Sequence, residues 1–229
     1  MTDWTAAELA IVWLSLKVAG VATLASVIPA IAVAWWLARG RFWGGTILNV
    51  LIHLPLVVPP VVTGYALLRV FGRRGMVGAW LEQYLGFQFS FRWTGAALAA
   101  GVMAFPLVVR AIRLGIESVD HQIEESAATL GASPAWVFVT VTLPLALPGL
   151  LAGLIIGFAK ALGEFGATIT FVSNIPGETQ TLALAIYTQL ERPGGEVAAM
   201  RLAWLSVAIS VLALVASEAL GRSFRRPQA

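Results

Sequence analysis

Long apolar runs alternate with short polar stretches along this chain, and five of the runs are long enough to cross a membrane. A spanning helix needs about 20 mainly apolar residues. Only a helix satisfies all of its own backbone hydrogen bonds inside hydrocarbon, so each run predicts an α-helix. The pattern therefore predicts an all-α integral membrane bundle of about five transmembrane helices. The runs cover, approximately, residues 9–37, 47–70, 94–116, 137–162 and 202–220.

Between the fourth and fifth runs, residues 165–190 contain two shorter apolar pieces. These pieces, ATITFV and TLALAIYTQL, are separated by the polar stretch SNIPGETQ, and neither is long enough to span. Irregular backbone at membrane depth is tolerated only where it is buried in protein or lines a wet cavity. We therefore expect a broken segment here, re-entrant or interfacial, on the outer side.

Composition supports the membrane assignment and excludes several kinds of chemistry. Hydrophobic residues make up 59% of the 229 residues and charged residues only 12%, whereas soluble domains usually contain about 25% charged residues. The chain has no cysteine, which excludes disulfides and thiolate metal sites. No Ser-rich or charged linker divides it, so we expect residues 1–229 to form a single transmembrane domain.

Basic residues near the ends of the runs predict the orientation, because they are retained preferentially on the cytoplasmic side. With the N-terminus outside and the C-terminus in the cytoplasm, three groups of arginines fall inside. The basic loop of residues 71–93, between the second and third runs, conflicts with this assignment. The three groups are Arg39 and Arg41, then Arg110 and Arg113, then Arg222, Arg225 and Arg226.

The polar stretch between the third and fourth runs contains residues that typically start and end a short helix. Asp120 is a suitable N-cap, and Glu124 and Glu125 place negative charge in the first turns, where the helix dipole favours it. Gly131 offers the left-handed conformation that ends a helix, and residues 133–134, Ser-Pro, suit the start of the next one. We expect a cytoplasmic helix of about ten residues, roughly 15 Å long, held between two membrane helices.

The spacing within this stretch resembles the EAA loop of type I ABC importer permeases: Glu-Ala-Ala, three residues, Gly, nine residues, Ile, one residue, Leu-Pro. Here Ser replaces the first Ala and Val replaces Ile. In that family the loop is a coupling helix that docks into a cytoplasmic ATPase, whereas an ordinary helical hairpin is the alternative. For the coupling loop 117–135 and the residues after it, the resemblance implies an ATPase-coupling role for Glu125, Ser126, Ala127, Gly131, Leu143 and Pro144.

Other segments are similar to the molybdate ABC transporter permeases, over nearly the whole chain. They are HLPLVVPPVVTGYALL, FPLVVRAIR, GEFGATITFVSNIPGETQTLALAIYT and the later PGGE. The resemblance implies alternating-access import of molybdate across the cytoplasmic (inner) membrane. It also implies three kinds of partner: a second copy of the chain, two cytoplasmic ABC ATPase subunits and an external molybdate-binding protein. Tungstate and sulfate remain alternative substrates.

Five residues are candidates for the translocation path or its gate. Glu164 is an ionisable residue at membrane depth, which indicates function by default, although pairing with Lys160 or a role at a helix end is an alternative. Polar and small residues that interrupt the second run suit a path or close helix packing about equally. The candidates are Thr63, Gly64, Glu164, Phe165 and Thr168.

The motifs that are missing also limit the function. The chain has no Gly-rich phosphate loop ending in Gly-Lys-Ser or Gly-Lys-Thr, and no HExxH or GxSxG motif. We therefore expect no catalytic residue, no metal and no cofactor on this chain, and ATP hydrolysis on a separate subunit. We expect the lipid bilayer and the transporter subunits as partners, and no nucleic acid. A passive membrane channel or scaffold is the alternative from another functional class. Transport by the importer should require ATP, whereas flux through a channel should not.

Overall fold

The computed structural model describes residues 6–40 and 44–224, with side chains described through residue 215. Within these residues every regular element is a helix, which confirms the all-α prediction. The elements are α1 (Ala6–Arg39), α2 (Gly45–Val57), α3 (Pro60–Phe71), α4 (Met76–Leu85), α5 (Trp93–Glu117), α6 (His121–Thr129), α7 (Pro134–Val137), a π-helix (Phe138–Thr142), α8 (Leu143–Leu145), α9 (Leu147–Leu162), α10 (Gly166–Val172), α11 (Leu182–Leu190) and α12 (Glu196–Phe224).

Three helices in the described part of the chain are long and apolar enough to cross a membrane alone: α1, α5 and α12. The count rises to five if each of two bent helix pairs serves as one span. The second predicted run, residues 47–70, is such a pair, because α2 and α3 meet at 113° instead of forming one helix. Val58 is extended, as a residue before proline prefers, and Pro60 starts a new helix without needing an N–H partner.

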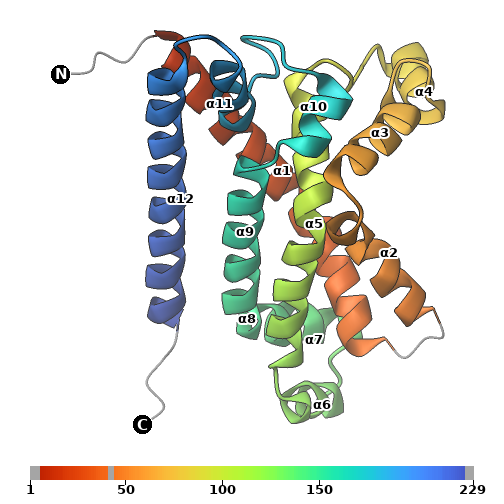
Figure 1. The fold of residues 1–229 in the computed structure, drawn as a ribbon. Helices are drawn as coiled ribbons and strands as arrows, with labels where there is room; N and C mark the ends of the chain where they lie inside the picture. Colours follow the sequence, from red (N-terminus) through yellow and green to blue (C-terminus); the bar gives the residue numbers. More distant parts are fainter. Residues whose placement is uncertain (1–5, 41–43, 225–229) are drawn as a thin grey trace.

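The fourth predicted run also differs from a single helix. Residues 134–145 form α7, the π-helix and α8, and they meet α9 at an angle of 68°. Pro148 in the first turn of α9 cannot donate a backbone hydrogen bond to the preceding turn, so a new helix axis begins there. The helix that continues through the bundle is therefore α9, and residues 137–145 lie at the α6 end of the molecule (Figure 1).

Helix α5 is the centre of the bundle, with α1 and α9 packed against it through small residues. Along α9, Gly149, Gly153 and Gly157 are spaced four residues apart and face α5. A Cβ on Gly149 would lie 2.6 Å from the Cα of Gly115, so the two backbones touch directly. Close backbone approach through glycines spaced in this way is a usual means of packing helices in membranes.

The segment of residues 165–190 is broken into two short helices as predicted, α10 and α11, at the end of the bundle opposite α6 (Figure 1). Its place on the outer side stays a prediction. Helix α10 packs against α3 and α5, and α11 packs against α12 and α1. The loop between them is held by Thr179, whose hydroxyl accepts from the Ile175 N–H at 2.8 Å and donates to the Ser173 carbonyl at 3.0 Å. Irregular backbone here is thus stabilised by protein contacts.

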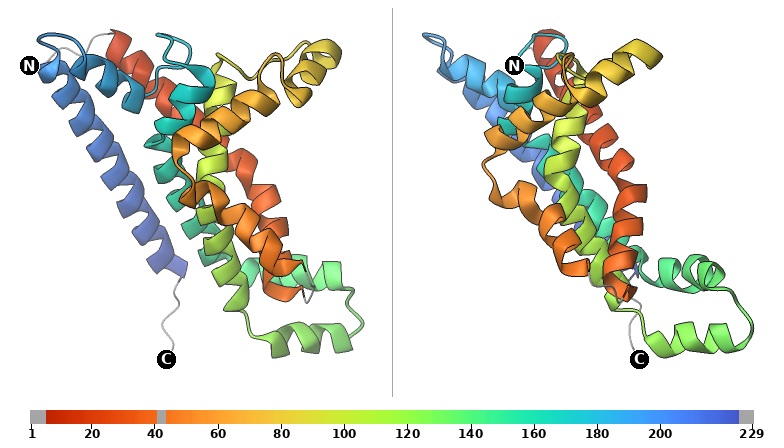
Figure 2. Two further views of the ribbon diagram at one scale, coloured as in Figure 1. Left: turned by 45° about the vertical axis from the view of Figure 1, so that its right-hand side comes forward. Right: turned by 90° about the vertical axis from the view of Figure 1, so that its right-hand side faces the viewer.

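Helix α12 stands at the edge of the molecule, with a large part of its length away from the other helices (Figure 1, Figure 2). Only 11% of its most apolar stretch is buried, whereas the figure for α5 is 67%. An ion pair of 2.7 Å between Arg201 and Glu8 ties its first turns to α1. Its apolar surface is what a helix next to lipid or to another membrane protein presents.

Candidate functional site: the projecting helix α6

Helix α6 projects from one end of the bundle, together with α7 (Figure 1, Figure 2). The Asp120 carboxylate accepts a hydrogen bond from the Gln122 N–H at 2.9 Å, which caps the start of α6 as predicted. After α6, Gly131 has a φ of 89°, a conformation that favours glycine. Ser133 then caps α7 by accepting from the Trp136 N–H at 3.4 Å. Local sequence therefore accounts for where α6 begins and ends.

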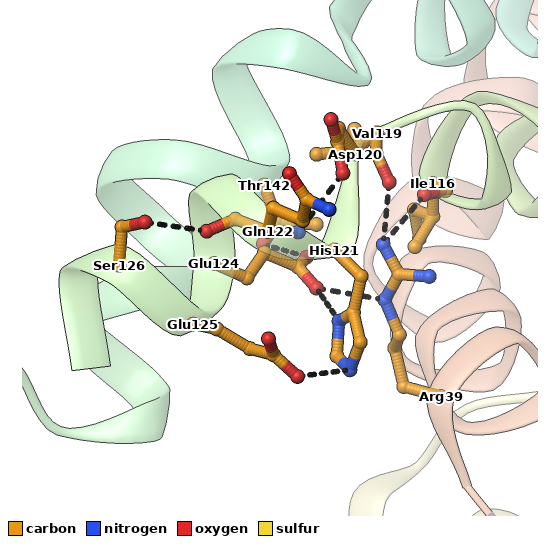
Figure 3. Close-up of polar contacts among 10 residues, drawn as sticks. All are labelled: Arg39, Ile116, Val119, Asp120, His121, Gln122, Glu124, Glu125, Ser126 and Thr142. Carbon is orange, nitrogen blue, oxygen red and sulfur yellow. Dashed lines mark hydrogen bonds and ion pairs between the residues drawn. The ribbon is translucent and has the colours of Figure 1, made fainter. Parts of the chain in front are cut away.

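The carboxylate of Glu124 joins α6 to two other elements (Figure 3). One oxygen accepts a hydrogen bond of 2.6 Å from the Thr142 hydroxyl, which belongs to the π-helix. The other lies 3.1 Å from Nε of Arg39, the last residue of α1, and 3.0 Å from Nδ1 of His121. The Glu124 side chain is only 11% exposed, so water screens these contacts far less than those of a surface ion pair.

Arg39 extends this connection to the end of α5. Its Nη2 donates to the carbonyl oxygens of Ile116 and Val119, each at 3.1 Å (Figure 3). The last carbonyls of a helix have no partner within the helix, and they carry its negative dipole end, so a guanidinium is well suited to them. Arg39 therefore holds the ends of α1 and α5 together and fastens α6 to both.

These contacts also affect the ionisation of Glu124. Burial alone would raise its pKa, but hydrogen bonds from Thr142, His121 and Arg39, together with the positive charge of Arg39, outweigh burial and lower the pKa below the ordinary 4.5. Glu124 is therefore ionised at neutral pH. The ion pair with Arg39 is fully formed under physiological conditions.

The other side of α6 faces away from the bundle. The Glu125 side chain is 67% exposed, and its carboxylate lies 3.6 Å from Nε2 of His121. Ser126 is exposed and donates to the Gln122 carbonyl of its own helix, at 2.7 Å. Leu130 and Trp136 are 89% and 63% exposed although both are apolar. Helix α6 and the start of α7 thus present a mixed polar and apolar surface with nothing packed on it within the described chain.

The remaining predicted coupling residues lie in or beside the same projection. Ala127 is half-buried and Gly131 is exposed in the turn after α6. Leu143 and Pro144 are in α8, half-buried and exposed respectively, where the projection meets the bundle. The structure therefore brings the predicted coupling residues to one end of the molecule, and their role in coupling stays a prediction.

The predicted path residues gather at the opposite part of the bundle, around α10. Glu164 is 3% exposed; one oxygen accepts from Lys160 Nζ at 2.7 Å and the other from the Ala167 N–H at 3.0 Å. Glu164 thus caps the start of α10 and is paired with Lys160, the arrangement given above as the alternative to a path role. Phe165 is half-buried, and its ring centroid lies 5.1 Å from that of Tyr187.

The other three path residues lie where α3 crosses α10. A Cβ on Gly64 would come 2.5 Å from the Ala167 carbonyl oxygen, so close helix packing explains this glycine. Thr168 is 1% exposed, and Thr63 is half-buried. In the single chain these side chains are largely enclosed by helices. Their part in a path or gate stays a prediction.

Comparison with known proteins identifies the family. Residues 30–226 match the family model described as "Binding-protein-dependent transport system inner membrane component". The chain belongs to this family. Its members are transport components, in agreement with the expectation that the chain is a multi-pass inner-membrane subunit and not an enzyme.

Relatives within the binding-protein-dependent family are similar over most of the chain. A molybdenum transport system permease protein ModB from Haemophilus influenzae is 52% identical over 219 residues, covering 96% of each protein. ModB from Escherichia coli K12 is 54% identical over 214 residues, covering 93% of each. The sulfate transport system permease protein CysT from E. coli K12 is 34% identical, over 90% of this chain and 74% of CysT.

Solved structures confirm the predicted fold of a type I ABC importer permease. The chain superposes on a chain of the inward-facing MetNI methionine ABC transporter with a TM-score of 0.73 at 16% identity, covering 95% of this chain and 96% of that one. It also superposes on a chain of a bacterial ABC transporter that imports alginate, with a TM-score of 0.76 at 14% identity, covering 97% and 82%. At these identities the likeness establishes the fold alone.

The residues that hold α6 in place could not be identified from the sequence. Glu124 was read only as favourable charge in the first turn of a helix, and Arg39 only as a marker of orientation. Thr142 was not singled out. Opposite charges at the end of one apolar run and in a later polar stretch offered a weak signal, but many other pairings were equally compatible with the sequence. No group of three or more His, Asp or Glu side chains that could hold a metal occurs in residues 6–40 and 44–215.

Proposed function

We propose that this chain is the transmembrane permease subunit of an ATP-driven importer that moves molybdate across the inner membrane by alternating access. The observation that carries the proposal is the anchored projection: α6 has an exposed face yet is joined through Glu124 and Arg39 to α1 and α5. Molybdate is supported by the identities of 52% and 54% to permeases named for molybdenum, against 34% for one named for sulfate.

The geometry suits transmission of force. A cytoplasmic ATPase subunit that binds α6 and the exposed Leu130 and Trp136 after it would displace a short rigid rod. The Glu124–Arg39 pair would pass that displacement to α1 and α5, and α7 and α8 would pass it to α9. Two ATPase subunits, a second copy of the chain and an external molybdate-binding protein complete the proposed transporter, with no cofactor on this chain.

The proposed orientation places α6 and the C-terminus in the cytoplasm and the N-terminus outside. Arg39, Arg110 and Arg113 then lie at the cytoplasmic end, as the preference for basic residues there requires. Arg41, Arg225 and Arg226, and the side chain of Arg222, lie outside the described residues. In the opposing basic loop, Arg73 pairs with Glu82 of α4 at 3.1 Å, which offsets one of its positive charges.

Reconstituted transport tests the proposal. Proteoliposomes containing this chain with its ATPase subunit, supplied with the external binding protein, should accumulate radiolabelled molybdate only when ATP is hydrolysed. Excess sulfate should compete poorly and excess tungstate more strongly. Uptake that proceeds without ATP would support a passive channel instead, and uptake blocked preferentially by sulfate would assign the chain to sulfate.

A further inference from the structure

A polar groove lies between α2 and the last turns of α5, on the end of the bundle that carries α6. One hollow of about 320 Å³ is lined by Asn49 and His53 of α2 and by Arg110 and Arg113 of α5, among others. A second hollow, of about 310 Å³, shares Asn49 and Arg113 and continues to the start of α2 at residues 45–46. We call the two together the α2–α5 groove.

The groove lies on one side of α2 only. On its other side, α2 faces α1 across a cavity of about 470 Å³ to which it contributes Leu51, Ile52 and Pro55. That cavity is almost entirely apolar, whereas Asn49 and His53 of α2 line the groove. Helix α2 therefore separates an apolar side from a side with cationic and hydrogen-bonding groups.

The charge of the groove is positive. Arg110 is exposed and forms no ion pair with any carboxylate among the residues described. Arg113 pairs through Nε with Glu117 at 2.7 Å, and Glu117 is the one acidic residue lining either hollow in the described chain. Two guanidiniums thus face one carboxylate. Basic residues are expected at the cytoplasmic end of a membrane bundle, and here two of them line one hollow together.

His53 adds a further group to the groove. Its Nδ1 lies 2.8 Å from the carbonyl oxygen of Asn49, and a carbonyl can only accept, so Nδ1 must donate. The hydrogen bond therefore orients the ring, while the Asn49 side-chain amide, which can donate to an oxyanion, lines both hollows. Guanidinium groups match the oxygens of a tetrahedral oxyanion by donating two parallel hydrogen bonds.

We propose that the α2–α5 groove is a cytoplasmic-side binding site for a tetrahedral oxyanion, with Arg110 and Arg113 as its principal ligands. The inference rests on the proposed function, because that function supplies the anion and the orientation. In this site the anion lies between Arg110 and Arg113, with the Asn49 amide as a further donor.

Equilibrium binding to the complete transporter tests the site. The permease and ATPase assembly, in detergent, without nucleotide and without the external binding protein, is titrated with radiolabelled molybdate. Arg110→Gln should weaken binding about tenfold, as expected for loss of a charge-assisted hydrogen bond. Arg113→Gln should weaken binding more, because it also leaves Glu117 unpaired beside the anion.

Two further variants separate a ligand role from structural damage. Glu117→Gln frees Arg113 and should strengthen molybdate binding several-fold, a gain that a damaged fold does not produce. Arg192→Gln removes an exposed positive charge in the loop before α12 and should leave binding unchanged.

The outcomes distinguish the groove from the proposed function itself. If wild-type protein imports molybdate with ATP but binds none in this assay, or if Arg110→Gln and Arg113→Gln bind like wild type, the groove is not the site. A decrease in affinity for Glu117→Gln would also overturn the assignment. Absence of ATP-dependent molybdate uptake by the wild type would instead refute the proposed function.

Discussion

Replacement of Glu124 by Gln should loosen α6 from the bundle without disturbing the junction of α1 and α5. Gln has nearly the same shape as Glu and can still accept a hydrogen bond from Thr142, but it carries no charge for Arg39 or His121. Arg39 keeps its two bonds to the carbonyls of Ile116 and Val119 in the variant. The perturbation is therefore confined to the contacts that fasten α6.

The size of the effect follows from burial and distance. Glu124 and Arg39 are 11% and 22% exposed and 3.1 Å apart, so their interaction should exceed the 0–1 kcal/mol typical of a surface pair. Hydrogen bonds to charged groups contribute about 1.5–3 kcal/mol. We expect local opening of α6 to become easier by about 2 kcal/mol, which corresponds to about 30-fold faster exchange of its protected amides.

Amide hydrogen exchange followed by mass spectrometry on the purified transporter measures this directly. Peptides covering α6 should exchange faster in the variant, while peptides covering the last turns of α5 should not change. In proteoliposomes the same variant should hydrolyse ATP but import less molybdate per ATP, because α6 would move without carrying α1 and α5 with it.

Glu125→Gln is the matched control. Glu125 is the next residue on the same helix, is 67% exposed, and lies 3.6 Å from the His121 ring, so exchange of α6 should stay within about twofold of wild type. The reasoning is refuted if Glu124→Gln and Glu125→Gln give the same exchange rates in α6. It is also refuted if exchange accelerates equally in α5 and α6, since that would indicate general unfolding.

Three further predictions follow from single positions. Gly131→Leu places a side chain at a φ of 89°, where strain costs about 1–2 kcal/mol. The variant should be recovered from membranes in normal amounts and should still hydrolyse ATP, while molybdate uptake falls. Loss of the protein from the membrane would instead mean that Gly131 has a structural role. The pKa of Glu124 is lowered, so its contribution is present above about pH 4.5 and lost as pH falls through the lowered pKa; the difference in α6 exchange between wild type and Glu124→Gln should shrink over that range. Gly64→Val brings a Cβ within 2.5 Å of the Ala167 carbonyl and should destabilise the protein by about 1–3 kcal/mol in thermal unfolding, whereas Gly20→Ala, with nothing within 4 Å, should have little effect.

The boundaries of α6 could be predicted from the sequence because they depend on neighbouring residues. An N-cap such as Asp120 bonds to an N–H two residues away, and Gly131 is needed where the chain turns left-handed. The broken outer segment was predictable for a similar reason, since neither of its apolar pieces is long enough to span. Such features need no knowledge of the rest of the fold.

Bends were harder to predict than breaks. Both bends occur beside prolines, at positions 59, 60 and 148, but the angles of 113° and 68° depend on what the two halves pack against. The same applies to Gly64, where the sequence allowed a path or a packing role and contact with α10 shows the packing. Glycine spacing along α9 was present in the sequence, yet its partner Gly115 on α5 was not identifiable without the structure.

By itself, the sequence determined the membrane setting, the all-α class, the position of the projecting helix and the family resemblance, because each depends on hydropathy or on residues close together in the chain. Only the tertiary structure decided how that helix is held. Glu124, Arg39 and Thr142 belong to three separate elements, and their contacts exist because α5 packs between α1 and α9 and brings the ends of these helices together. In the folded chain Glu164 is buried between helices, whereas Arg110 lines an open groove. The sequence could not decide either outcome, because burial and pairing depend on neighbours far away in the sequence.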